Sequence, residues 1–174
     1  MRSSVSFFAG ITAALLVSAP LSAHVTLEAR EAPTDSYFKA VFSVSHGCEG
    51  SATNRLRVRI PDGVTGVKPQ PKTGWELATV KTKLATPAQG SHGEAITETI
   101  TEVSWSGGRL LDEHFDQFVM QVRLPNAAPN TVLYFPTVQE CEKGITRWIE
   151  IPEPGAKPTG LKEPAPALRL TPKP

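Results

Sequence analysis

Apolar and polar residues alternate along much of the chain, and residues 54–60 show this pattern most clearly. Leu56, Val58 and Ile60 occupy one face of the segment, whereas three arginines occupy the other. A period of two residues predicts a half-buried β-strand, because successive side chains of a strand point to opposite faces of a sheet. We interpret the arginine row as the solvated outer face of this sheet, in preference to an anion-binding stripe.

Six other segments are rich in β-branched and aromatic residues, as strands are. These strand candidates are residues 36–46, 75–84, 96–105, 115–124, 131–138 and 145–151. Turn signals containing Gly, Pro, Asn or Asp separate several of them, at residues 61–63, 72–74, 106–108 and 125–126. No long stretch has the periodicity of an amphipathic helix. The pattern predicts an all-β fold, a single antiparallel β-sandwich of seven or eight strands.

The N-terminal segment has the features of a secretory signal peptide. Arg2 supplies a positive start, residues 7–19 form an apolar run, and Ala23 is a small residue before a cleavage point. The apolar run of about 13 residues is too short for a membrane anchor, since a helix needs roughly 20 to span a bilayer. Cleavage after Ala23 would make His24 the first residue of an exported, periplasmic protein without a membrane span.

The C-terminal segment differs in composition from the rest of the chain. Residues 152–174 contain seven prolines and few residues that could form a core. This composition is typical of an extended, disordered chain. We therefore predict three parts: a signal peptide at residues 1–23, one folded domain at 24–151 and a disordered Pro-rich tail at 152–174.

The charge balance excludes some partners. The chain has 18 Lys and Arg residues against 17 Asp and Glu residues, so it is close to neutral. Nucleic acids and anionic membrane surfaces attract strongly basic proteins, and nothing in this composition favours either.

Cys48 and Cys141 are the only cysteines. In an oxidising compartment, two cysteines most simply form one disulfide. Such a bridge would close a loop of roughly 90 residues and contribute about 4 kcal/mol in the chain-entropy model. The alternative is a pair of thiolates that bind a metal.

A histidine at the mature N-terminus offers a chelate that no internal residue can form. Its α-amine and its own Nδ1 can bind one metal ion together, and nitrogen donors in this arrangement favour tetragonal Cu(II). After the leader is removed, Met120 is the only methionine, so soft ligands for Cu(I) are few. We therefore expect His24 to bind one Cu(II) per chain. The alternative is that His24 only marks the place where cleavage falls.

Oxygen ligands are available in the segment DEHFDQF at residues 112–118. We expect Phe115 and Phe118 to help fill the core, so that the polar residues around them project at the rim of the sheet. A carboxylate from this segment could then bind the metal. The alternative is a solvent-exposed acidic turn.

Several short motifs resemble the YcnI-like family of copper-binding domains. They are HVTL directly after the leader at residues 24–27, HGCEGS at 46–51, RIPDGV at 59–64, GWE at 74–76, FDQF at 115–118, and LYF at 133–135 followed by Gly144 and Trp148. Each motif is weak alone, but their order and spacing together are specific. The resemblance extends from His24 to about residue 151.

This resemblance implies an immunoglobulin-like sandwich with a single-histidine brace. In that brace the N-terminal histidine supplies amine and imidazole nitrogens, an acidic residue supplies oxygen, and a tryptophan packs beside the copper. His24 and Trp148 match directly. The family's segment often reads Phe-Asp-Glu-Phe, whereas Gln117 replaces the glutamate here. Asp116, Glu113 or the amide oxygen of Gln117 therefore remain as oxygen ligands.

The expected function is copper trafficking or homeostasis in the periplasm, without catalysis. Other periplasmic copper chaperones or transporters are the expected partners. One alternative is a copper-dependent oxygenase, which would need a second, internal histidine from among His46, His92 and His114. The other is a metal-free adhesion or assembly module.

Overall fold

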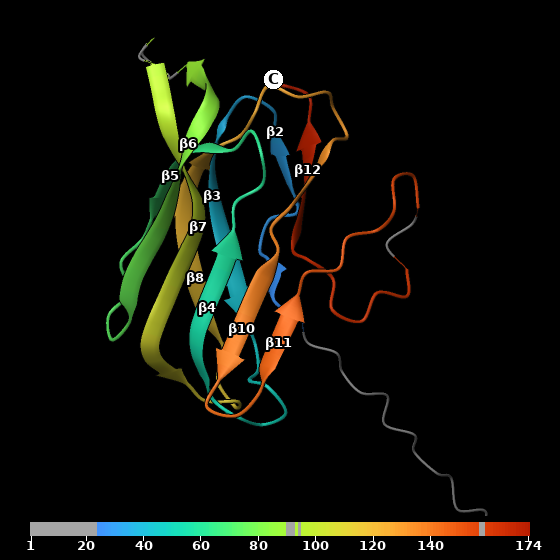
Figure 1. The fold of residues 1–174 in the computed structure, drawn as a ribbon. Coiled ribbons are helices and arrows are strands. Elements are labelled where there is room, and N and C mark those ends of the chain that lie inside the picture. The colour runs from blue at the N-terminus through green and yellow to red at the C-terminus, as the bar shows by residue number, and fades with distance from the viewer. Residues whose placement is uncertain (1–23, 90–92, 94, 157–158) are drawn as a thin grey trace, which may run out of the picture.

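The computed structural model describes residues 24–89, 93, 95–156 and 159–174. These residues form twelve strands and contain no helix (Figure 1). The signal peptide predicted at residues 1–23 and the candidate ligand His92 lie outside the described residues. No helix long and apolar enough to cross a membrane occurs in the described ranges.

Two sheets form the sandwich, and a smaller third sheet joins it. The first sheet has the order β1 (Thr26–Leu27), β3 (Tyr37–Val44), β8 (Asp116–Arg123) and β5 (Thr65–Pro69). The second has the order β11 (Ile145–Trp148), β10 (Thr137–Cys141), β4 (Thr53–Arg59), β7 (Ala95–Leu110) and β6 (Glu76–Gln89). The third consists of β2 (Glu31–Pro33), β12 (Ala167–Thr171) and β9 (Val132–Tyr134). Strand β12 pairs with β2 in parallel, and the other strand pairs are antiparallel.

The core lies between the two larger sheets and follows from the alternation of their strands. In β4, Leu56 and Val58 are fully buried, while Arg55 and Arg57 point outward and pair with Glu140 of β10. This confirms the predicted solvated arginine face. The largest buried side chains are Trp105, Phe42, Phe118, Phe135, Leu56, Met120 and Leu124. Each such side chain stabilises the fold by roughly 1.5–3 kcal/mol through burial.

The predicted all-β sandwich is confirmed, but the described residues form twelve strands where seven or eight were predicted, and two local predictions are wrong. Residues 106–108 are part of β7 and do not form a turn. A Cβ on Gly108 would lie 2.1 Å from the Trp75 ring, so glycine is needed there for close packing. Phe115 does not fill the core: it is 71% exposed because it precedes β8, whereas Phe118 within β8 is fully buried.

The predicted disordered tail is also wrong. Strand β12 lies between β2 and β9, and its Leu168 and Leu170 are completely buried. The prolines of the segment flank this five-residue strand and do not interrupt it, because proline is tolerated outside a hydrogen-bonded ladder. A hydrogen bond from Lys173 to Asp35 (2.8 Å) also ties down the C-terminus and lowers the pKa of the Asp35 carboxyl.

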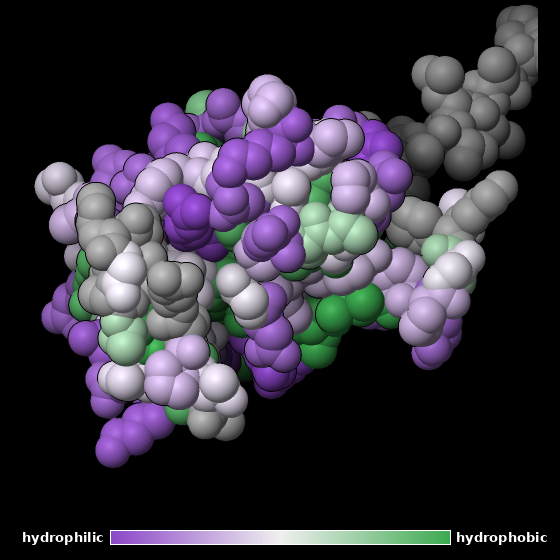
Figure 2. Space-filling model, turned by 90° about the horizontal axis from the view of Figure 1, so that it is seen from above, coloured by the Kyte–Doolittle hydropathy of each residue, from purple (hydrophilic) through white to green (hydrophobic). Residues whose placement is uncertain are grey.

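The surface agrees with the near-neutral composition. On the face seen from the end at which the chain terminates in Figure 1, hydrophilic residues predominate and small hydrophobic areas lie between them (Figure 2). Charges of both signs pair on the outer face of the second sheet, where Arg57 lies between Glu140 and Glu102.

Because β12 belongs to the folded domain, Leu170→Ala should lower the free energy of unfolding by about 2–5 kcal/mol through the cavity that it leaves. Urea unfolding followed by circular dichroism measures this loss. Leu161→Ala is a matched control, since Leu161 lies in the same C-terminal segment but is only half-buried. Equal losses in the two variants would contradict the core position of β12.

Candidate metal centre

The predicted ligand His24 lies against the predicted neighbour Trp148. His24 precedes β1, the edge strand of the first sheet, and Trp148 ends β11, the edge strand of the second. Their ring centroids are 5.3 Å apart with an interplanar angle of 73°, an edge-to-face contact. Val25 and Leu27 are buried on the inner side of this segment, which leaves His24 half-buried at the edge of the sandwich.

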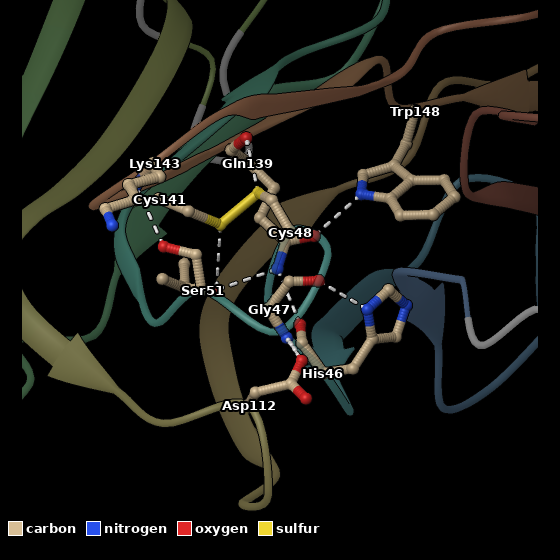
Figure 3. The surroundings of a disulfide bond; sticks show 10 residues. His46, Gly47, Cys48, Ser51, Asp112, Gln139, Cys141, Lys143 and Trp148 are labelled. Carbon is tan, nitrogen blue, oxygen red and sulfur yellow. Dashed lines mark hydrogen bonds between the residues drawn. A yellow bond between two sulfur atoms is a disulfide. The ribbon is translucent and has the colours of Figure 1, made fainter.

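A second imidazole, that of His46, also contacts Trp148. The two ring centroids are 6.0 Å apart and the rings are nearly perpendicular, at 83°. His46 is half-buried in the loop between β3 and β4, and its Nδ1 contacts the Gly47 carbonyl oxygen (Figure 3). A carbonyl oxygen only accepts hydrogen bonds, so Nδ1 carries the proton and Nε2 carries the lone pair in neutral His46.

The buried amide of Gln139 connects Trp148 to His46. Its Oε1 accepts a hydrogen bond from Trp148 Nε1 (2.9 Å), and its Nε2 donates to the His46 carbonyl oxygen (2.7 Å) (Figure 3). The same nitrogen also donates to Thr53 Oγ1 (2.7 Å). Gln139 has no exposed surface. Since a buried amide without partners is costly, these three bonds hold the tryptophan and the histidine loop in fixed positions relative to β10.

The predicted disulfide between Cys48 and Cys141 is confirmed, with an S–S distance of 2.06 Å and a Cα–Cα distance of 5.9 Å. It joins the His46 loop to the end of β10 (Figure 3) and leaves neither cysteine as a thiolate for a metal. Gly47 packs so closely that a Cβ there would lie 1.8 Å from the Ser51 carbonyl oxygen. Its N–H donates to the Asp112 carboxylate at 2.8 Å, which fixes the loop at a further point.

Two of the three predicted oxygen ligands lie at the start of β8 and already have polar partners. Asp116 accepts a hydrogen bond from the Lys72 ammonium (2.7 Å), which neutralises the carboxylate locally. The Gln117 amide nitrogen donates to the Glu28 carboxylate at 2.9 Å and to Ser43 Oγ at 3.4 Å. A metal would therefore compete with Lys72 for Asp116, whereas the amide oxygen of Gln117 is not the atom bonded to Glu28.

Glu113, the third predicted oxygen ligand, is in the turn before β8 and its side chain is 77% exposed. Its carboxylate is 3.9 Å from Nε2 of His114, beyond hydrogen-bond distance. Glu142 is not one of the predicted ligands; the hydrogen bond that its carboxylate accepts from the Arg109 side chain lowers the pKa of this carboxyl. No three His, Cys, Asp or Glu side chains gather as a metal cage within the described part of the chain.

Comparison with known proteins identifies the family. The family model described as a domain of unknown function, DUF1775, matches residues 24–170. The chain belongs to this family. The DUF1775 match begins at His24 and includes most of β12, so the family domain is longer at its C-terminus than the predicted 24–151. No curated protein matches the chain.

A solved structure establishes the class of the sandwich. An uncharacterized protein from Nocardia farcinica, whose crystal structure is described as revealing an immunoglobulin-like fold, is 24% identical to this chain. The match covers 85% of this chain and 98% of the other, with a TM-score of 0.61. This DUF1775 domain therefore has an immunoglobulin-like fold, as the family resemblance implied.

His24 and Trp148 were expected from the sequence, whereas Gln139 was not. Its position in β10 is the signal that could have identified it. Gln139 lies on the same face of the strand as Thr137 and Cys141, and all three are buried. A glutamine on the inward face of a strand needs internal hydrogen-bond partners. It therefore indicates a polar network in the core.

Gln139→Leu removes that network while keeping most of the volume. It leaves the Trp148 N–H, the His46 carbonyl and the Thr53 hydroxyl without their partner, so we expect a loss of about 3 kcal/mol of stability. Urea unfolding measures the loss, and the indole N–H resonance of Trp148 should shift. The N–H of Trp105, which donates to the Gln70 carbonyl at 3.0 Å, is an internal reference. Gln121→Leu on the exposed face of β8 is the control and should cost little; an equal cost would refute the role of Gln139.

Proposed function

We propose that this DUF1775 protein binds one Cu(II) ion at its mature N-terminus and serves copper trafficking or homeostasis in the periplasm. The α-amine and imidazole of His24 are the nitrogen ligands of a single-histidine brace. The observation that carries the proposal is the edge-to-face contact between His24 and the buried Trp148. This is the pair that the YcnI-like resemblance places at a copper site.

The nitrogen donors favour Cu(II) over metal ions that prefer sulfur ligands or oxygen ligands. Two nitrogens from one residue form a chelate without a cage of separate side chains, and nitrogen donors suit Cu(II) at the top of the divalent affinity order. Trp148, only 4% exposed, packs edge-to-face against the imidazole and gives it an apolar neighbour on the protein side. The family match that begins at His24 supports cleavage after Ala23, which creates the amine.

The oxygen ligand comes from Glu113, Asp116 or Gln117, and the cost of recruitment differs among them. Asp116 must leave Lys72, so its recruitment costs the energy of an ion pair at 2.7 Å. Glu113 is largely exposed and makes no close ion pair with His114, so it can reorient at little cost. Gln117 would offer a neutral and weaker oxygen.

A copper-dependent oxygenase is the second candidate, because His46 lies against the same tryptophan as His24. Such an enzyme activates O2 at reduced copper. The copper-loaded protein with ascorbate in air would then sustain hydrogen peroxide release, with ascorbate as the source of electrons. A copper carrier should instead suppress the background reaction of the metal.

The first experiment titrates Cu(II) into protein that begins at His24 and records its electron paramagnetic resonance spectrum. A matched protein carries one additional N-terminal glycine, which moves the amine away from the imidazole. We expect one-to-one binding with nitrogen hyperfine structure, which the extra glycine abolishes.

Equal binding by both proteins would disprove the brace and direct attention to the internal histidines. Absence of binding in both would disprove the copper function and favour the metal-free adhesion module.

A further inference from the structure

We propose that His46 supplies a second imidazole nitrogen to the copper ion that His24 binds. The inference rests on the proposed function, keeps the amine and imidazole of His24 as ligands, and replaces the single-histidine brace by a site with two histidines. The site would then combine the amine and imidazole of the first mature residue with an imidazole from the loop between β3 and β4.

His24 and His46 pack against the same tryptophan. Both imidazoles contact the same indole edge-to-face, at centroid distances of 5.3 Å for His24 and 6.0 Å for His46. These distances limit the separation of the two imidazole centroids to at most about 11 Å and place both rings around one indole. They come from separate segments, the residue before β1 and the loop after β3, and Trp148 is their shared neighbour.

The tautomer of His46 is suited to metal binding. Its Nδ1 donates to the Gly47 carbonyl oxygen, so Nε2 has the lone pair that a metal needs. Metal-binding histidines usually donate their other ring N–H to a carbonyl or carboxylate group, which fixes the ring orientation and raises the basicity of the ligating nitrogen. His46 thus has the hydrogen bond that prepares an imidazole for metal binding.

The loop that carries His46 is held in place by several bonds. Its own carbonyl accepts a hydrogen bond from the fully buried Gln139, and Cys48, two residues later, is bonded to Cys141. The intervening Gly47 donates to Asp112. A ligand held in place before the metal arrives loses little conformational entropy on binding, which favours affinity.

His114, the third described histidine, is less suited to bind the copper ion than His46. His114 is 63% exposed in the turn before β8, and its Nε2 faces the Glu113 carboxylate. No buried amide and no disulfide holds it. His114 therefore provides a matched control for substitution of His46 at the same end of β8 and β3.

The test compares His46→Gln with His114→Gln in protein that begins at His24. Pulsed electron paramagnetic resonance counts the imidazoles bound to Cu(II), and competition with a chelator of known affinity gives the dissociation constant. We expect two imidazoles in the wild type and in His114→Gln. We expect one in His46→Gln, with affinity reduced at least about tenfold, since even ligand-supporting residues contribute 10–100-fold.

The outcomes separate this inference from the proposed function. If the extra N-terminal glycine abolishes binding, the wild type shows one imidazole and His46→Gln keeps full affinity, the His46 assignment is wrong and the single-histidine brace stands. Two imidazoles in His46→Gln would also overturn the assignment, because the second would come from another histidine. If the extra glycine has no effect, the proposed function fails and this inference fails with it.

Folding is checked by the melting temperature of each variant without copper. Should His46→Gln fail to fold, the same count is made with 15N-labelled histidine rings on protein that carries His92→Gln and His114→Gln together, in which His24 and His46 are the remaining histidines. Two coupled imidazoles per copper support the inference, and a single one overturns it.

Discussion

The side-chain amide of Gln139 has no contact with solvent, and the whole candidate site depends on how it is bonded. Its oxygen and both amide hydrogens have partners: the Trp148 indole, the His46 carbonyl and the Thr53 hydroxyl. These partners belong to β11, to the loop after β3 and to β4. Leaving any of them unpaired in the core would cost about 1–3 kcal/mol, so their relative positions follow from one side chain. The wall against which His24 packs is therefore part of the hydrophobic core and its hydrogen bonds, and not a mobile surface feature.

The Cys48–Cys141 disulfide strengthens the same arrangement by a different physical route. Cys141 lies two residues from Gln139 on the inward face of β10, and Cys48 lies two residues from His46. The bridge therefore repeats, covalently, the connection that the amide makes by hydrogen bonds. It acts mainly by restricting the unfolded chain, since it joins residues 93 apart, whereas the amide acts in the folded state. Gly47 completes the loop because a larger residue would collide with the Ser51 carbonyl.

Local patterns predicted local features well, but apart from the sandwich and the disulfide they did not predict the long-range features. The alternation in β4 predicted its buried and exposed faces, and the cysteine count predicted the disulfide. The core strand β12 was missed because seven prolines in its segment masked the alternation of Leu168 and Leu170. Gln139 was missed because its partners His46 and Thr53 are 93 and 86 residues away in the chain. No local pattern encodes such a network; only the pairing of β10 with β4 and β11 brings it together.

The proposed copper site would have two chemical requirements, and both point to the same compartment. Before cleavage the nitrogen of His24 is a peptide nitrogen joined to Ala23, so the amine half of the chelate does not exist. The loop that presents His46 is closed by a disulfide, and disulfides persist in oxidising compartments. On the proposed function, the precursor in a reducing cytosol would lack both the amine and the covalent closure of the loop. Export would thus complete the site, and copper loading would follow processing and oxidation of the chain.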